Sequence, residues 1–172
     1  GDAQVYGNAQ VSGNAWVSGN AWVSGNAQVS GNARVSGNAR VSGNARVSGD
    51  ARVSGNARVS GDARVYGNAR VYGNAWVYGD AWVSGNAWVS GNAQVCGDAH
   101  IFWASKVGAE NGTLTAYATK DGSIEVTRGC FRGTVAEFLF ASAANHDARV
   151  KREYELLIEV ARSRIEAALS EA

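Results

Sequence analysis

The sequence predicts an all-β solenoid over residues 1–102, followed by a small α+β unit over residues 103–172. Two observations lead to this fold class. Residues 1–102 divide into seventeen hexapeptides that follow the pattern Gly-(Asn/Asp)-Ala-x-Val-(Ser/Tyr) without an insertion, and the pattern stops after them. A six-residue period does not match the three-and-four spacing of an apolar helix stripe. It matches a coil with flat sides, in which each hexapeptide forms one side.

The residue types within each hexapeptide support a strand followed by a corner. Valine is β-branched and favours extended backbone. Because side chains alternate along a strand, alanine and valine point inward, while x and Ser/Tyr point outward. The Gly-Asn and Gly-Asp pairs tolerate positive φ and supply the corners. We therefore expect a core of stacked valines, with asparagine side chains that hydrogen-bond along the corners.

The composition excludes several classes of protein. The chain has 22 glycines but no proline, which excludes collagen. A hydrophobic fraction of 45% and a charged fraction of 18% exclude a disordered polyelectrolyte. Two cysteines are too few for a disulfide scaffold. No run of eighteen apolar residues and no leader pattern is visible, so we expect neither a membrane helix nor a signal peptide.

The strands of the second unit are predicted from alternation and turn residues. A first strand ends at Val107 and Gly108 and continues from the last coil. Residues 113–119 alternate with period two and predict a second strand. Residues 120–123 contain Asp-Gly, a strong hairpin signal, and residues 123–127 return as the partner strand.

Two helices complete this unit. Thr134 is the expected N-cap of a helix over residues 135–144, with Glu137 as the acid of a capping box. Asp147 is the expected cap of a second helix, which has one apolar face and runs to about Leu169. Since an open coil exposes unpaired strand edges, we expect this unit to cap one end of the solenoid. At the other end, the repeat begins in register at Gly1, which predicts end-to-end association or further upstream repeats.

The repeat resembles the hexapeptide-repeat family, which forms left-handed parallel β-helices. The resemblance covers residues 1–102 and implies three hexapeptides per triangular coil, hence between five and six coils. It also implies a homo-oligomer, with a homotrimer favoured. Most enzymes of this family are acyltransferases that use a histidine base and an acyl-CoA donor, and a carbonic-anhydrase branch binds zinc through three histidines.

The whole chain also resembles a group of uncharacterised hexapeptide-array proteins of phages and gut bacteria, often labelled hexapeptide transferase or polymer-forming protein. Their tails are similar to Val107-Gly108, to Gly112-Thr113-Leu114-Thr115 and to Gly129-Cys130-Phe131-Arg132-Gly133-Thr134. This resemblance implies a phage protein in the cytoplasm of a bacterial host, and it implies no particular activity.

The outward position x carries the candidate ligand-binding residues. Arginine occupies it in seven consecutive repeats: Arg34, Arg40, Arg46, Arg52, Arg58, Arg64 and Arg70. Tryptophan flanks this run at Trp22, Trp76, Trp82 and Trp88. With eighteen residues per coil, these side chains would form a belt around the column, which we call the Arg/Trp belt. Arginine forks match phosphate or carboxylate and tryptophan stacks on bases, so the belt predicts a nucleotide-like anionic ligand.

An alternative explanation needs no ligand. Gln, Arg and Trp codons can differ by a single base (CAG, CGG, TGG), so drift of a duplicated repeat would produce the same set of residues. Stacking of arginine on tryptophan also stabilises a flat side by itself. The exposed tryptophans are equally compatible with an oligomer interface. The sequence leaves these interpretations open.

Catalytic and metal sites have less support in the sequence. His100 is the only histidine in the array and is the candidate base of an acyltransferase, but no carboxylate orients it. Besides His100 the chain has only His146, so it lacks the three zinc histidines of the carbonic-anhydrase branch, and no metal or other cofactor is expected. Cys130 lies between Arg128 and Arg132, shortly before the first predicted helix. It is either a reactive thiol or a small buried residue.

The leading hypothesis is therefore a non-catalytic oligomeric scaffold or binding protein that binds or sequesters an anion on the Arg/Trp belt. The alternatives are an acyltransferase that uses His100 and a structural element of a virion or a surface. No membrane partner is expected.

Overall fold

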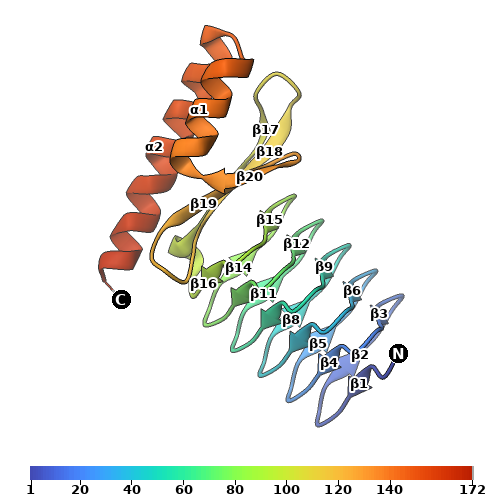
Figure 1. The fold of residues 1–172 in the computed structure, drawn as a ribbon. Coiled ribbons are helices and arrows are strands. Elements are labelled where there is room, and N and C mark those ends of the chain that lie inside the picture. The colour runs from blue at the N-terminus through green and yellow to red at the C-terminus, as the bar shows by residue number, and fades with distance from the viewer. Residues whose placement is uncertain (172) are drawn as a thin grey trace. The chain divides into compact units, whose positions relative to one another are not determined.

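The computed structural model describes residues 1–171 (Figure 1). The chain divides into two compact units. We call the first, Gly1–Asp98, the array, and the second, which begins at Ala99, the C-terminal unit. The array thus ends four residues before the predicted boundary at residue 102.

The array contains sixteen strands of two residues, one in each hexapeptide. Each strand consists of the variable residue x and the valine that comes after it. The strands are β1 (Gln4–Val5), β2 (Gln10–Val11), β3 (Trp16–Val17), β4 (Trp22–Val23), β5 (Gln28–Val29), β6 (Arg34–Val35), β7 (Arg40–Val41), β8 (Arg46–Val47), β9 (Arg52–Val53), β10 (Arg58–Val59), β11 (Arg64–Val65), β12 (Arg70–Val71), β13 (Trp76–Val77), β14 (Trp82–Val83), β15 (Trp88–Val89) and β16 (Gln94–Val95).

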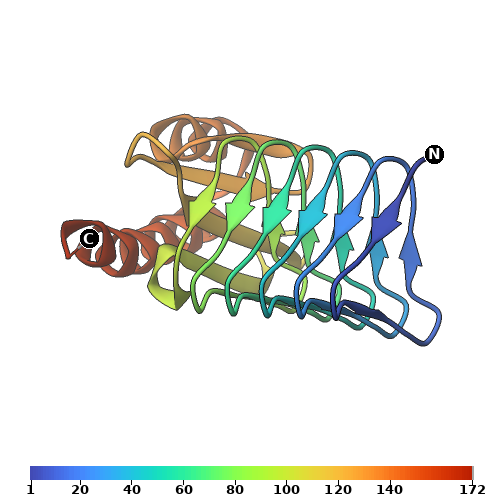
Figure 2. The ribbon, with the colours of Figure 1, turned by 90° about the horizontal axis from the view of Figure 1, so that it is seen from below.

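Every third strand belongs to the same parallel sheet, which confirms three hexapeptides per coil and a solenoid of about five turns. The sheet orders are β1-β4-β7-β10-β13-β16, β2-β5-β8-β11-β14 and β3-β6-β9-β12-β15. Figure 2 shows the strands of successive coils side by side along the array. The coils are joined by backbone hydrogen bonds, such as that from the Arg52 amide to the Ala69 carbonyl at 2.9 Å.

The core of the array is the predicted column of alanine and valine. From Ala21 to Val95 these side chains are buried, and the valines among them have no exposed surface. In the first coil, by contrast, Val5 is 48% exposed, because no preceding coil covers it among the residues described. Burying a valine side chain contributes roughly 1.5–3 kcal/mol, so the column is the main source of stability of the array.

The corners are formed by glycine and by hydrogen-bonded asparagine. The corner glycines have positive φ, for example +68° at Gly49 and +70° at Gly55. The Gly-Asn and Gly-Asp pairs supply the corners as predicted; the glycine alone adopts positive φ, because a turn of this type needs it only at its first central residue. The predicted side-chain ladder is confirmed: Asn38 donates to Asn56 at 3.1 Å, and Asn56 donates to Asn74 at 3.1 Å.

The prediction that the seventeenth hexapeptide, residues 97–102, forms a further side of the column was wrong. The ladder would pair the Trp82 amide with the carbonyl of Ala99, but this amide donates to the Asp98 carboxylate at 2.8 Å. The chain then forms a short 3-10 helix, Asp98–His100, and Ile101 pairs with Tyr117 in another sheet. A side chain thus replaces the backbone acceptor that a further coil would supply, and the array ends here.

The C-terminal unit contains a four-stranded antiparallel sheet in the order β17-β18-β19-β20. The strands are β17 (Ile101–Val107), β18 (Gly112–Ala118), β19 (Ile124–Arg128) and β20 (Phe131–Thr134). The two strands predicted at residues 113–119 and 123–127 are present within one residue. β17 ends at Val107 as predicted, but it pairs with β18 instead of continuing a coil. β20 was not predicted.

Two helices pack against this sheet (Figure 1). α1 (Val135–Asn145) has Thr134 as its N-cap, and Thr134 and Glu137 form the predicted capping box. α2 (Ala148–Ser170) begins after the Asp147 cap, as predicted. The buried core of the unit lies between the sheet and the helices and includes Leu114, Val126, Phe138, Tyr154, Ile158 and Ile165.

Candidate functional site

The Arg/Trp belt lies on the outer faces of all three sheets of the array. Adjacent strands place Arg40 opposite Arg58, and Arg46 opposite Arg64. On the third side, Arg52 lies between Arg34 and Arg70. Parallel strands are about 4.8 Å apart, so each side presents two or three stacked guanidinium groups.

The seven belt arginines are exposed, and none of them forms an ion pair with any residue in the range 1–171. The acids nearest to these arginines in the sequence, Asp50 and Asp62, lie at the corners of the array. Asp50 accepts a hydrogen bond from Asn32 at 3.0 Å, and Asp62 accepts one from Asn44 at 3.0 Å. The belt is therefore a surface of positive charge that the described residues do not neutralise.

Three belt arginines stack on tryptophans of the neighbouring coil. The guanidinium carbon of Arg40 lies 5.1 Å from the ring centre of Trp22, that of Arg64 lies 5.2 Å from Trp82, and that of Arg70 lies 5.7 Å from Trp88. Such contacts contribute about 0.5–1 kcal/mol at exposed sites. They explain part of the Arg–Trp pairing without a ligand.

Tyrosines at the outward corner position add a second aromatic layer. Tyr66 meets Trp82 edge to face with ring centres 5.8 Å apart, and Tyr72 meets Trp88 in the same way at 5.9 Å. Trp76 donates to the Ser60 hydroxyl at 3.1 Å, yet its ring stays exposed, as do the rings of Trp22 and Trp82. The belt therefore offers partly exposed aromatic rings next to guanidinium groups that have no ion pair among the described residues.

His100 lies outside the predicted ladder, in the 3-10 helix Asp98–His100. The side chain is half-buried, and its Nδ1 atom is buried without a hydrogen-bond partner among residues 1–171. Burial lowers the pKa of this imidazole below its ordinary value, because desolvation disfavours the charged form. The neutral ring is the form that acts as a general base, although no carboxylate of the described chain orients it.

Cys130 is exposed in the turn between β19 and β20, so the interpretation as a small buried residue was wrong. Within the described part of the chain, no three residues of the types His, Cys, Asp and Glu lie close enough together to bind a metal. Of the helices that the structure describes, none has the length and apolar character to cross a membrane.

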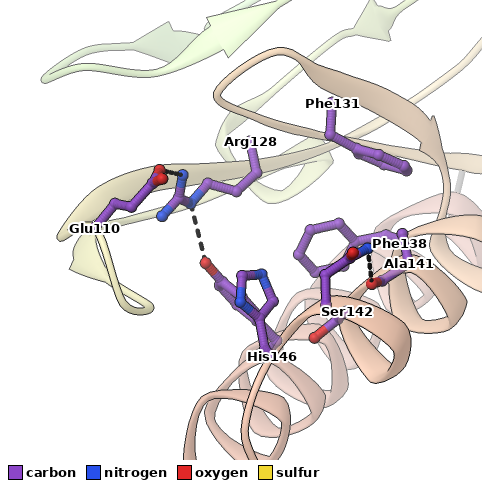
Figure 3. Close-up of a pocket in the computed structure, with 9 residues that line it drawn as sticks. Glu110, Arg128, Phe131, Phe138, Ala141, Ser142 and His146 are labelled. Atoms are coloured by element: carbon purple, nitrogen blue, oxygen red, sulfur yellow. Dashed lines mark hydrogen bonds and ion pairs between the residues drawn. The ribbon is translucent and has the colours of Figure 1, made fainter.

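A pocket of about 210 Å³ lies within the C-terminal unit (Figure 3). At one side, the Arg128 guanidinium donates to Glu110 at 3.2 Å and to the Tyr154 hydroxyl at 3.0 Å. At the other side lie the rings of Phe131 and Phe138, with centres 5.3 Å apart. The full lining is Glu110, Arg128, Phe131, Phe138, Ala141, Ser142, Asn145, His146 and Tyr154.

The sequence did not reveal this pocket, because its lining comes from both helices, two strands and two loops. From the sequence, Arg128 is notable only as a neighbour of Cys130, and His146 only as a possible zinc ligand. One signal was available: Ser142 lies in the otherwise apolar run of α1, and a polar residue there needs a partner or a role.

The comparisons with known proteins concern the array. The family model described as the YdcK Beta solenoid repeat matches residues 9–25, 27–43, 39–53, 51–65, 63–79 and 81–97, which together make up half of the chain. Neither the curated proteins nor the solved structures gave a match. The matched segments all lie within the array, whose strands form the three parallel sheets. The chain therefore belongs to the YdcK β-solenoid repeat family.

Proposed function

We propose that this protein is a non-catalytic scaffold or binding protein whose Arg/Trp belt binds an anionic ligand with an aromatic part, such as a nucleotide. The observation that supports it best is the set of seven exposed arginines without an ion pair in the described residues. Like charges opposite each other on adjacent strands destabilise a sheet by about 0.2–1 kcal/mol. An anion laid across Arg46 and Arg64, or across Arg34, Arg52 and Arg70, would remove that repulsion.

The aromatic rings suggest why the ligand would be more than a simple anion. Trp22, Trp76 and Trp82 are exposed at the edges of the arginine ladders. A base stacked on such a ring contributes about 1–3 kcal/mol, while the phosphates next to it meet the guanidinium forks. The belt surrounds a flat-sided column, so it suits a ligand that lies along a surface better than one that needs an enclosed cavity.

Calorimetric titration with nucleoside triphosphates and short single-stranded oligonucleotides tests this function. We expect heat of binding at low salt and an affinity that falls as salt rises, because bound phosphates release counterions. Replacing Arg52, Arg58 and Arg64 by glutamine should weaken binding strongly. Glutamine occupies the same position in β1, β2, β5 and β16, so the fold accommodates it.

The matched control replaces Arg149, Arg152 and Arg164 of α2 by glutamine, which changes the net charge by the same amount outside the belt. This variant should bind as the original chain does. Equal losses in both variants would show that only overall charge matters, and an absence of heat at low salt would reject the function.

A second candidate is an acyltransferase that uses His100, as in the hexapeptide-repeat enzymes. The unpartnered Nδ1 atom and the lowered pKa of His100 favour it, since both keep a neutral base available. Turnover of acyl-CoA with a hydroxyl or amine acceptor, lost in His100→Ala, would support this candidate. Unchanged turnover in that variant would reject it.

The third candidate is a structural element of a virion or a surface, and it shares with the first the expectation of a homo-oligomer, preferably a trimer. The exposed rings of Trp22, Trp76 and Trp82 on the sides of the array favour association. Light scattering together with electron microscopy distinguishes the cases: rods or filaments support the structural element, a discrete trimer supports the scaffold, and a monomer excludes both assemblies.

A further inference from the structure

The polar end of the pocket in the C-terminal unit contains a guanidinium group with a weak counterion. The Arg128 side chain is only 12% exposed, whereas its partner Glu110 is 81% exposed. An ion pair with so exposed a carboxylate contributes little to stability, since water solvates the acid equally well. A largely buried positive charge, by contrast, needs an anion that is held firmly. The Arg128 site is therefore incompletely neutralised by the chain itself.

The geometry of Arg128 is fixed by its other contacts. Its Nε atom donates to the Tyr154 hydroxyl at 3.0 Å, and one terminal nitrogen approaches the Val107 carbonyl at 3.5 Å. Tyr154 is itself buried and packs edge to face on Phe138, with ring centres 5.1 Å apart. Arginine has five N–H donors, so a fork held in this way keeps donors for a ligand carboxylate.

Ser142 provides an independent sign of a ligand. The residue is 3% exposed, and its Oγ atom is buried without a hydrogen-bond partner among residues 1–171. A helical serine usually bonds a carbonyl of the preceding turn when nothing else is available. A buried hydroxyl without a partner costs free energy, and this one lines the pocket. A polar group of a bound molecule would satisfy it.

The other end of the pocket selects for an apolar body. Phe131, Phe138 and Ala141 line it, and Figure 3 shows the two rings opposite the Arg128–Glu110 pair. A volume of about 210 Å³ is below the roughly 300–1,000 Å³ of sites for drug-sized ligands, so the occupant must be small. We propose that this pocket binds a small organic carboxylate with an aromatic or branched apolar body. Its carboxylate meets Arg128 in place of Glu110, and its body packs against the two phenylalanines.

The test uses the full chain and three probes: benzoate, its neutral isostere benzamide, and inorganic phosphate as an anion without an apolar body. Calorimetry measures the affinity, and amide chemical shifts in NMR locate the site. We expect benzoate to bind more tightly than either other probe, with shift changes at residues 107–112 and 128–146. Equal affinities for benzoate and benzamide, tighter binding of phosphate, or shifts confined to the array would overturn the proposal.

Glu110→Gln is the decisive variant, because Glu110 is exposed and its replacement leaves the fold intact. Removing the competing carboxylate should tighten benzoate binding roughly two- to fivefold, the factor that corresponds to an exposed ion pair. Glu166→Gln removes the same charge from the C-terminal half of α2, away from the pocket, and should leave the affinity for benzoate unchanged. Arg128→Gln should abolish binding. If Glu110→Gln binds benzoate no better than the original chain, or if neither binds it at millimolar concentration, the carboxylate site does not exist.

Discussion

Gly55 and Gly73 stack backbone on backbone at one corner of the array. A methyl group on Gly55 would lie 3.1 Å from the amide nitrogen and 3.2 Å from the carbonyl oxygen of Gly73. Gly55 also has φ of +70°, a backbone conformation that residues other than glycine rarely adopt. The corner thus requires glycine for two independent reasons, the backbone angle and the close approach of the next coil.

Gly55→Ala is therefore expected to lower the free energy of unfolding. The left-handed conformation alone costs an alanine about 1–2 kcal/mol, and the contact with Gly73 adds to this. Urea denaturation followed by circular dichroism measures the change. Gly97→Ala is the control, because Gly97 has no positive φ and no atom within 4 Å of the added methyl group. A similar loss in both variants would contradict the role of the stacked corner.

Val53→Ala in the middle of the column is expected to destabilise the array by about 1.5–3 kcal/mol, because it removes two buried methyl groups and leaves a cavity. Val53 has no exposed surface, whereas Val5 in the first coil is 48% exposed. Val5→Ala should therefore cost much less. Equilibrium unfolding of the two variants under the same conditions checks the order, and the reverse order would argue against the valine column as the main source of stability.

Arg46→Gln is expected to stabilise the free protein at low ionic strength. Arg46 lies opposite Arg64, so the substitution removes a like-charge contact of about 0.2–1 kcal/mol. The gain should shrink as salt rises, because exposed charges are screened. Thermal unfolding over a range of NaCl concentrations measures it. Arg162→Gln serves as the control of opposite sign, since it breaks the pair with Glu166 at 2.9 Å. Destabilisation by Arg46→Gln at low salt would refute the repulsion.

Asp121 in the β18–β19 hairpin should titrate far below its ordinary range. Hydrogen bonds from the hydroxyls of Thr119 and Ser123 and from the Ser123 amide lower the pKa of this carboxyl to about 2. Because the folded pKa lies below the unfolded value, its contribution to stability is full above pH ~4 and is lost as the pH falls towards 2. Carbon NMR of the carboxyl group measures the pKa.

Ser123→Ala should raise the pKa of Asp121 towards its ordinary value, because the variant removes one of the donated hydrogen bonds. Ser163→Ala on the exposed face of α2 should leave it unchanged. An Asp121 pKa near 4 in the original chain would show that the hairpin contacts do not form in solution.

The coils could be predicted from the sequence because each hexapeptide contains its own strand, its own inward residues and its own corner. The end of the array could not. Gly-Asp at residues 97–98 reads like Gly-Asp at residues 49–50, yet Asp50 continues the asparagine ladder, while Asp98 accepts the Trp82 amide. The difference arises only in the folded chain, because no further coil supplies a carbonyl to the Trp82 amide.

The C-terminal unit shows the same division between local and distant information. The caps Thr134 and Asp147 act within one helical turn, and both were predicted. β20 was not, since Phe131–Thr134 contains a glycine, is short and forms a strand only because β19 lies beside it. The pocket depends on Glu110, Arg128 and Tyr154, which lie in three elements that only the folded chain brings together.

The ladder that links the Arg52 amide to the Ala69 carbonyl runs along the axis of the array, as do its equivalents in the other coils. A force that pulls the array lengthwise therefore loads these bonds one layer after another, so the coils peel off singly. Each released coil of three hexapeptides frees eighteen residues, or roughly 60 Å of extended chain. Under such a force, we expect the array to lengthen in regular steps.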